Sequence, residues 1–547
     1  MDRRKFLKNI TYAGSAGTII SGLPLKSWAL PSSLKEAVQT SGNDNVVVFI
    51  QLHGGNDALN TLIPVDQYNE YYNFRPNIAI PSDGARKFLN LDTNLTIENQ
   101  VGIHPDIVSL KQMYEQGRAA IVQNVGYEHM NLSHFRGRDI MFMGGDADDN
   151  FASGWMGRFL NEEYPGYPEA YPSQTQPDPI AIEIGNSMSL AFHRNNGIPI
   201  GFNVQSPQAF YDLITNVGID PPIKFPDSHA GDELRYLMEF EKKSNQYAER
   251  LKNVYEAGKN SSVVYPTTYP LNAPESSLQN PLSGQLKLIA RLLAGGVKTR
   301  VFLCRIGGFD THGEQVESYD STIGTHAALI YHLFSAVKAF HDDLHQLGLH
   351  KKVLSLTFTE FGRRVYSNAS YGTDHGTATP VFLFGEGLKP GVYGTNPELN
   401  DLNGGNIKYA IDYRQIYTSI VNDWFEATPK GLEATGFGGW LDSRIPLFTE
   451  SVGIQNNSAM KDDFVNIYPN PVRSKLQIQF RTSKQLQIYQ VKILNTVGKA
   501  VMNLPESQLV HSFQTISVDV SGLKSGTYIV QITAEGNRIA NKKIIKK

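Results

Sequence analysis

Five short apolar runs in the middle of the chain are separated by longer stretches with helical periodicity. The runs cover residues 46–50, 119–124, 300–305, 353–358 and 381–384. Between the third and the fourth run, apolar side chains recur at helical spacing at Leu329, Leu333, Val337 and Leu344. Strand-length apolar runs that alternate with helices are typical of a mainly parallel β-sheet covered by helices. The sequence therefore predicts an α/β domain built on such a sheet.

Composition excludes several other classes of protein. With 547 residues, 41% of them hydrophobic and 19% charged, the chain has the composition of a globular protein and not of a disordered, collagen-like or integral membrane one. Cys304 is the single cysteine, which excludes an intrachain disulfide and a cysteine-based zinc cluster. Because Cys304 lies in a predicted apolar strand, we expect its thiol to be buried and inert.

Charge is distributed unevenly along the chain. Residues 31–463 carry 33 basic and 49 acidic residues, a net charge of −16, whereas residues 464–547 have a net charge of +9. An acidic body of this kind is a poor nucleic-acid binder, so we expect no nucleic-acid partner. The same charge tolerates bound cations, although it is also explained by solubility alone.

The N-terminus has the pattern of an export signal. Residues 1–8 are basic, and residues 11–25 form a weakly apolar run that is too short and too polar to span a bilayer. We therefore predict a signal peptide over residues 1–30 and no integral membrane span in the mature chain. The Arg3-Arg4 pair is similar to that of twin-arginine signals, while a Sec signal is the alternative.

The C-terminus consists of short alternating segments with glycine and asparagine turns, which predict a small β-sandwich over residues 464–547. Its opening Tyr468-Pro469-Asn470-Pro471, its strand at residues 526–532 and its basic end resemble the type A sorting domain of the type IX secretion system. The resemblance implies the type IX machinery of Bacteroidetes as a partner, and a location at the cell surface or outside the cell. A carbohydrate-binding or adhesive sandwich is the alternative. The polar residues 451–463 are the predicted linker.

Residues 160–280 have weak periodicity and are rich in proline, tyrosine and asparagine. A segment without a clear strand or helix pattern inside an α/β domain suggests an insertion. We expect residues 160–280 to be a large insertion or cap.

Polar side chains follow the predicted strands at the points where the strands end. These side chains are His53 and Asp57 after the first run, His129, Ser133 and His134 after the second, Asp310 and His312 after the third, Glu360 after the fourth, and Asp374 and His375 in the loop that enters the fifth. In open α/β sheets, ligands bind outside the carboxyl ends of the strands. Carboxylate and imidazole groups are ligands of divalent cations. The sequence therefore predicts a metal site at one edge of the sheet.

Several of these residues also have local explanations. Asp57 and Asp310 suit tight turns or helix caps, and Ser133 suits a helix N-cap. His341 and His345 lie one helical turn apart beside two aspartates, and we expect that pair to form a solvated helix face.

Taken together, the motifs at residues 52–61, 131–135, 308–312, 359–363 and 373–376 resemble one family. It is the domain-of-unknown-function family 1501, which is placed in the alkaline phosphatase-like superfamily. The resemblance covers about residues 44–450 and implies a doubly wound α/β fold. It also implies the chemistry of that superfamily, in which two metal ions clamp the attacking and leaving oxygens of a phosphoryl or sulfuryl transfer.

The resemblance assigns roles by position. The implied metal ligands are Asp57, Asp310, His312, Glu360, Asp374 and His375, and the ion is zinc, calcium or magnesium. Ser133 falls where the nucleophile would lie, with His134 beside it as a second catalytic candidate. Apart from the resemblance, Arg136 or Arg363 is expected to neutralise the charge of an anionic ester. Phe361 stands where the family pattern implies a histidine ligand, so a single-ion or rearranged site fits at least as well as a two-metal site.

These observations favour an exported, metal-dependent hydrolase-like protein that acts on phosphate or sulfate esters. The alternative is a non-catalytic cell-surface binding or assembly protein on the same fold. Phe361 favours the alternative, and the number of retained acidic and histidine residues favours the hydrolase.

Overall fold

The computed structural model describes two units, residues 1–449 and 450–547, and each is considered by itself. The described residues are 19–20, 23–24, 43–167, 170–215, 246–449, 464–468, 472–481, 488–495, 499–504, 507–508, 513–534 and 537–547. The predicted signal peptide at residues 1–30 lies outside them, apart from the short strands β1 (Ile19–Ile20) and β2 (Leu23–Pro24). The predicted linker at residues 451–463 also lies outside the described residues.

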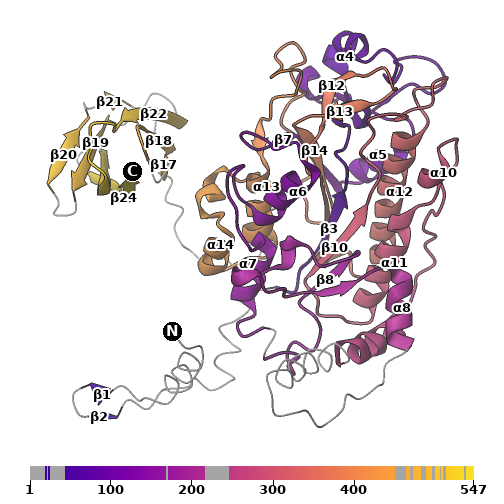
Figure 1. Ribbon diagram of the computed structural model, residues 1–547, viewed down its shortest axis with the longest axis horizontal. Coiled ribbons are helices and arrows are strands. Elements are labelled where there is room, and N and C mark those ends of the chain that lie inside the picture. Colours follow the sequence, from indigo (N-terminus) through magenta and orange to yellow (C-terminus); the bar gives the residue numbers. More distant parts are fainter. Residues whose placement is uncertain are drawn as a thin grey trace, which may run out of the picture. The chain divides into compact units, whose positions relative to one another are not determined.

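The first unit is built on a central sheet (Figure 1). Its strand order is β15-β7-β14-β11-β3-β10-β8-β9, and β16 lies beside β7. The bounds are β3 (Val46–Leu52), β7 (Ala119–Gly126), β8 (Ala181–Ile184), β9 (Phe202–Val204), β10 (Val301–Ile306), β11 (Val353–Phe358), β14 (Thr379–Phe384), β15 (Gly391–Tyr393) and β16 (Ile411–Asp412). All neighbouring pairs are parallel except the two that involve β14. The prediction of a mainly parallel sheet is confirmed.

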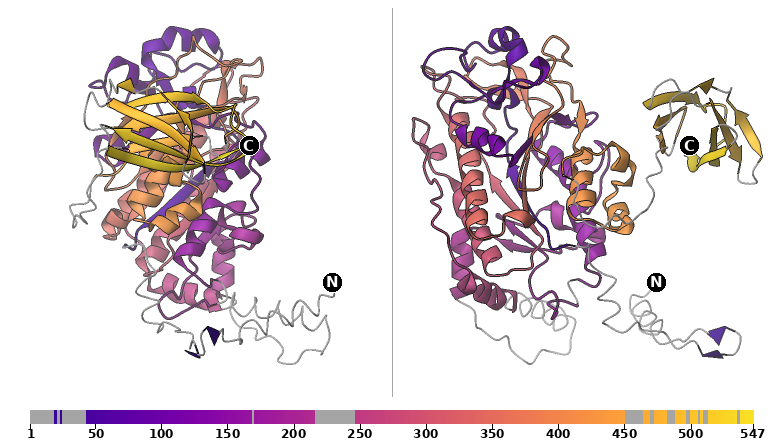
Figure 2. Two further views of the ribbon diagram at one scale, coloured as in Figure 1. Left: turned by 90° about the vertical axis from the view of Figure 1, so that its left-hand side faces the viewer. Right: turned by 180° about the vertical axis from the view of Figure 1, so that it is seen from behind.

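Helices cover both faces of this sheet (Figures 1 and 2). One core joins Val46, Val48 and Ile50 of β3 to α5 (Val108–Glu115), α11 (Pro281–Ala294) and α12 (Thr325–Gln346). The other core joins Val47 and Phe49 to α6 (His134–Met143), α7 (Trp155–Glu163), α13 (Tyr413–Ser419) and α14 (Pro429–Thr435). Successive side chains of a strand point to opposite faces, so a strand covered on both faces is apolar throughout. This is why β3 has the sequence VVVFIQL.

The interior strand β10 contains the single cysteine. Cys304 is free and buried, and its burial raises the pKa of the thiol. Because a thiol rather than a thiolate is a poor nucleophile, the prediction of an inert cysteine agrees with its environment.

The described part of residues 160–280 is not simply a cap. The short strands β8 and β9 extend the central sheet next to β10, and α8 (Pro207–Thr215) follows them. The prediction of an insertion is corrected for these strands. They contain only four and three residues, too few to show a period in the sequence.

A small layer supports one end of the sheet. It contains β4 (Leu62–Pro64), β5 (Leu89–Asn90) and β6 (Val101–Ile103) in a second sheet, α4 (Tyr68–Phe74), and the hairpin of β12 (Arg363–Ser367) with β13 (Thr373–His375). Tyr71 of α4 and Val365 of β12 share its apolar core. This packing fixes the hairpin on which Asp374 and His375 lie.

The helix predicted around Leu329–Leu344 is α12, but its polar residues are placed differently from the prediction. His345 has 61% of its side chain exposed, as a solvated face requires. His341 is buried, and its Nε2 lies 3.0 Å from Oγ of Ser355 in β11. The prediction is wrong for His341 because α12 packs against α11 as well as the sheet, so its buried surface is wider than one apolar stripe.

The buried His341 gives a prediction for acid stability. Burial, with the charge of Arg118, lowers the pKa of His341 to about 3, whereas an unfolded histidine titrates near 6.5. Protons therefore bind the unfolded state more strongly, so the contribution of His341 is complete above pH 6.5 and is lost as the pH falls toward 3. Between pH 7.5 and 5.0 we expect the free energy of unfolding to fall by about 2 kcal/mol because of this residue.

Urea unfolding of wild type and His341→Gln at the two pH values, in the presence of chelator, measures this loss. An equal loss in both proteins contradicts the assignment.

The second unit contains antiparallel strands in two sheets. One sheet has the order β17-β18-β22, and the other has β20-β19-β23-β24 with β21 beside β19. The bounds are β17 (Phe464–Tyr468), β18 (Lys475–Arg481), β19 (Ile488–Asn495), β20 (Ala500–Asn503), β21 (Ser507–Gln508), β22 (Phe513–Asp519), β23 (Gly526–Ala534) and β24 (Asn537–Lys546). Residues from both sheets, among them Leu476 and Val530, share one core. The predicted β-sandwich is confirmed.

Among the described residues, none of the helices combines the length and the apolar character that a membrane span requires.

Candidate metal centre

Four segments meet at one end of the strands of the central sheet. Three of them follow the carboxyl ends of β7, β10 and β11, which run in the same direction. The fourth precedes β14 and includes β13, on which Asp374 and His375 lie. Because β14 is antiparallel to both of its neighbours, its amino end lies at the edge where theirs finish. The predicted convergence of these loops is therefore a consequence of the topology.

Asp310 lies at the centre of the cluster. Its Oδ1 is 3.2 Å from Nε2 of His375 and 3.3 Å from Nε2 of His312, and its Oδ2 is 3.2 Å from Nε2 of His134. The rings of His134 and His375 are in edge contact, with centroids 4.4 Å apart. Three imidazoles from separate loops thus present the same nitrogen to one carboxylate.

The other nitrogen of each imidazole is held from behind. Nδ1 of His134 lies 2.8 Å from Oε1 of Glu360, Nδ1 of His312 lies 3.2 Å from Oδ1 of Asp374, and Nδ1 of His375 lies 2.9 Å from the carbonyl oxygen of Leu132. A carbonyl or carboxylate oxygen only accepts, so each Nδ1 carries the hydrogen in the neutral ring. Each Nε2 is then left with a lone pair that faces Asp310. Metal-binding histidines are oriented by outer partners in this way.

Charge in the cluster is consistent with one bound cation. The hydrogen bond that His134 donates to Glu360 raises the pKa of His134, whereas burial lowers the pKa of His375. Burial alone would raise the pKa of Asp310, but the hydrogen bond from Arg363 and its positive charge outweigh burial, and the pKa is about 2. The carboxylate therefore stays charged, and the two neighbouring imidazoles differ in their affinity for a proton.

The ligand atoms of His134, Asp310 and His375 all lie within 4.8 Å of one another, as the ligands of one ion must. Nε2 of His134 is buried, and although it is 3.2 Å from Asp310 it is not aligned for a hydrogen bond. A buried nitrogen without a hydrogen bond costs free energy unless something else binds it. Nitrogen and oxygen ligands of this kind suit a divalent metal such as zinc, so the residues present fit the implied ion.

Glu360 and Asp374 were predicted as ligands, and the structure places both behind the imidazoles. Glu360 is buried, and its Oε1 also accepts a hydrogen bond from the backbone N–H of Gly54 at 2.8 Å. A Cβ at Gly54 would lie 2.2 Å from the backbone nitrogen of Asp310, and its φ is +124°. Only glycine allows the end of β3 to approach the Asp310 loop this closely.

Arg363 was predicted to bind substrate, but it is buried and fully occupied. Its guanidinium donates to the carbonyl oxygens of Gly54, Gly55, Phe309 and Thr373, and to Oδ1 of Asp310 at 2.7 Å. With 0% of its side chain exposed, Arg363 positions Asp310 and the loops around it. Arg136 is also turned away, because it donates to the carbonyl oxygens of Ala147 and Asp149.

Ser133 is exposed at the start of the ten-residue helix α6, where its side chain accepts from the backbone N–H of Arg136 at 3.5 Å. It is therefore the predicted N-cap, directly before His134. Phe361 is buried, and its ring centroid lies 4.9 Å from that of His134 and 4.5 Å from that of His375. Phe361 forms the apolar floor beneath the two imidazoles.

The structure does not bring Asp57 to this cluster. Asp57 caps α3 (Ala58–Thr61), and its Oδ2 lies 2.8 Å from Arg75 and 2.6 Å from Nε2 of Gln315. Burial alone would raise its pKa, but Arg75 lowers it, so the pair is charged. A carboxylate engaged by a buried arginine and a glutamine is not free to bind a metal, which corrects the predicted role of Asp57.

One member of the site was not predicted. The carbonyl oxygen of Leu132 orients His375, and a backbone group leaves no mark on residue type. His53, which follows the first predicted strand, is exposed, and its ring centroid is 6.0 Å from that of His134.

Comparison with solved structures finds distant matches. A protein in the alkaline phosphatase superfamily from Vibrio parahaemolyticus is 10% identical, with 89% of this chain and 85% of that chain covered and a TM-score of 0.31. The PsFucS1 sulfatase from Pseudoalteromonas sp. is 12% identical, with 88% and 85% covered and a TM-score of 0.28. Alkaline phosphatase from the Antarctic bacterium TAB5 is 11% identical, with 72% and 99% covered and a TM-score of 0.24. Among curated proteins, none matches this chain.

Two family models match parts of the chain. Residues 229–422 match the family described as Protein of unknown function (DUF1501), a stretch that includes Asp310, His312, Glu360 and His375. Residues 466–547 match the Secretion system C-terminal sorting domain, which marks secreted proteins of the cell surface. Both resemblances predicted from the motifs are confirmed over these residues. The chain thus contains a stretch similar to the DUF1501 family, followed by a C-terminal sorting domain of the kind that marks secreted, cell-surface proteins.

Proposed function

We propose that this protein is a metal-dependent hydrolase of phosphate or sulfate esters. One observation carries the proposal: three histidines from separate loops turn Nε2 toward a single carboxylate, while each Nδ1 is fixed by an acceptor. A divalent cation would bind the nitrogen lone pairs and the carboxylate together, as imidazole and carboxylate ligands do in zinc sites.

We assign His134, Asp310 and His375 as ligands of one divalent cation, and His312 as a fourth ligand from the exposed side. Glu360 and Asp374 orient two of the imidazoles. A divalent cation in such a site polarises an ester oxygen and favours attack by a nucleophile at neutral pH.

Ser133 supplies the remaining chemistry from this chain. Its hydroxyl is exposed at the amino end of α6, beside His134. The helix dipole favours an anion at that end, so a charged ester would lie with its oxyanion against the first turn of α6. The Ser133 hydroxyl would either bind the oxyanion or attack the phosphorus or sulfur. In the attack, the new bond to the serine oxygen forms as the bond to the ester's alcohol oxygen breaks, and the alcohol leaves with the serine proton.

The test uses the full chain, stripped of metal and supplied in turn with zinc, magnesium or calcium. We expect turnover of an aryl phosphate or an aryl sulfate that chelator abolishes and one of the ions restores, and slower turnover for Ser133→Ala. Ser277→Ala, at a serine in α10 (Glu275–Leu278), is a control that should keep wild-type rates. A protein that binds no metal contradicts the proposal. Metal binding without turnover of either ester supports the non-catalytic surface protein instead.

Glu360 provides a prediction about metal affinity alone. In Glu360→Gln, the amide oxygen still accepts from Nδ1 of His134, but the negative charge behind the imidazole is lost. Loss of an outer partner weakens metal binding by roughly 10–100-fold, and we expect about tenfold for this conservative change. Isothermal titration with zinc measures it. Unchanged affinity would mean that His134 is not a ligand.

A further inference from the structure

A second group of histidine and carboxylate side chains lies at the opposite ends of the strands of the central sheet. His345 is in the last turn of α12, His350 begins the short helix η5 (His350–Lys352) that leads into β11, and Glu386 follows β14. The first site lies beyond the other end of β11 and β14. Helix α12, with 22 residues, rises about 33 Å along this direction.

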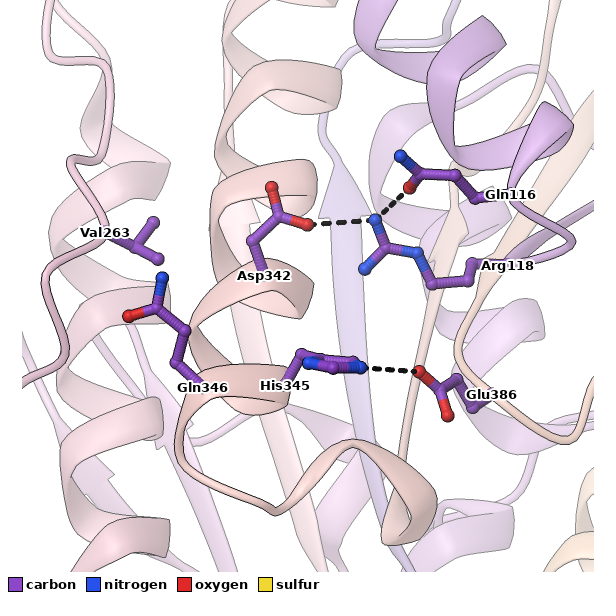
Figure 3. Close-up of a pocket in the computed structure, with 7 residues that line it drawn as sticks. All are labelled: Gln116, Arg118, Val263, Asp342, His345, Gln346 and Glu386. Atoms are coloured by element: carbon purple, nitrogen blue, oxygen red, sulfur yellow. Dashed lines mark hydrogen bonds and ion pairs between the residues drawn. The ribbon is translucent and has the colours of Figure 1, made fainter.

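Both imidazoles face the same carboxylate. Nε2 of His350 lies 3.3 Å from Oε2 of Glu386, and Nε2 of His345 lies 3.8 Å from Oε1. The two rings are stacked, with centroids 4.5 Å apart and an angle of 22° between their planes. The three ligand atoms lie within 4.8 Å of one another. Figure 3 shows His345 and Glu386 facing each other across the gap.

Protein partners do not account for this arrangement. Nδ1 of His350 is buried without a hydrogen bond, so its ring is not held by an internal network. The nearby side chains of Arg118 and Lys338 both form ion pairs with Asp342, at 2.9 Å and 2.5 Å. In the part of the chain that the structure describes, Glu386 has ion pairs with the two histidines and with no lysine or arginine.

One divalent cation would satisfy both nitrogens and the carboxylate at once. His345 and Glu386 also line a pocket of about 540 Å³. An ion held between them would keep an open position on that side.

We propose that His345, His350 and Glu386 form a second, independent site for a divalent transition metal of the zinc type. Two histidines and one glutamate are a known three-ligand set for zinc, with solvent in the remaining position. The bound ion links the last turn of α12, the turn before β11 and the segment after β14. It therefore stabilises the end of the sheet that lies farthest from Asp310.

The experiment titrates the metal-free full chain with zinc and measures both stoichiometry and the rise in melting temperature. We expect His350→Gln to lose one equivalent of zinc, or to bind it at least about tenfold more weakly, and to lose part of the zinc-dependent rise. Glu386→Gln, at a partly exposed residue, should give the same result if His350→Gln folds poorly. The matched control is His129→Gln, which removes an exposed histidine 3.7 Å from Glu128.

The outcome is independent of the proposed function. Asp310→Asn removes an ion from the first site and should leave the equivalent that depends on His350 in place. If His350→Gln and Glu386→Gln both match His129→Gln in stoichiometry and in melting temperature, the second site does not exist. Glu386 is then only an ion-pair partner of the histidines.

Discussion

An Asp310→Asn protein is expected to bind its catalytic cation more than about 100-fold more weakly than wild type and to lose metal-dependent turnover. The lost charge lies at the centre of the site, within 3.3 Å of Nε2 of His134, His312 and His375. Loss of an outer partner already costs roughly 10–100-fold in metal affinity, and Asp310 is the anionic ligand itself. A 100-fold change corresponds to about 2.7 kcal/mol of binding free energy. Isothermal titration of the metal-free full chain measures it.

The fold should survive this change. Arg363 loses the charged oxygen of Asp310 but keeps the carbonyl oxygens of Gly54, Gly55, Phe309 and Thr373 as acceptors. The matched control is Asp374→Asn, because Asp374 contacts only Nδ1 of His312 in the cluster. We expect it to weaken binding much less than Asp310→Asn does. Equal effects of the two changes would show that the ion does not lie at Asp310.

The position of the site was predictable because burial and topology leave clear marks on a sequence. A strand covered on both faces is apolar throughout, so the interior strands were recognisable, and so were the polar residues after them. Whether β14 is parallel or antiparallel to its neighbours was not predictable, because a run of apolar residues is compatible with both directions. The loop that enters β14 reaches the site only because this strand is antiparallel to its neighbours.

The roles of the carboxylates were harder to predict than their location. Asp310, Glu360 and Asp374 all follow or precede sheet strands, and nothing in residue type distinguishes a ligand from a group that orients a ligand. The distinction depends on which side of an imidazole the oxygen lies, and that is fixed by packing. Gly54 shows this, because its backbone N–H donates to the same oxygen of Glu360 that lies against Nδ1 of His134.

Asp57 was assigned to the metal for a similar reason. The sequence Gly54-Gly55-Asn56-Asp57 follows a buried strand, where ligands of the sheet are expected. Its actual partner, Arg75, lies 18 residues later and has 0% of its side chain exposed. A fully buried arginine is rare, so charge patterning alone gave no reason to expect one beside Asp57.

The buried pair of Asp57 and Arg75 leads to the largest expected effect on stability. In Asp57→Asn, the one amide oxygen can keep the cap of α3 but cannot also accept from Gln315, and the charge of Arg75 is left unpaired. Removing one partner of a buried ion pair costs about 3–5 kcal/mol, and we expect about 3 kcal/mol here because Arg75 also donates to Asn60, Arg364 and Val365. Urea unfolding of the two proteins measures this difference.

A second substitution separates this structural role of Asp57 from the metal ligation that its sequence position suggested. Asp57→Asn combined with Arg75→Met removes the unpaired charge, and replacing a whole buried pair by uncharged groups is often close to neutral. We therefore expect the double variant to recover most of the lost stability and to bind zinc at the Asp310 site with wild-type affinity. A double variant that is stable but no longer binds zinc at that site would return Asp57 to the ligand set. Recovery of both properties would show that Asp57 holds α3 and α4 together through Arg75, while the ion depends on the histidines around Asp310.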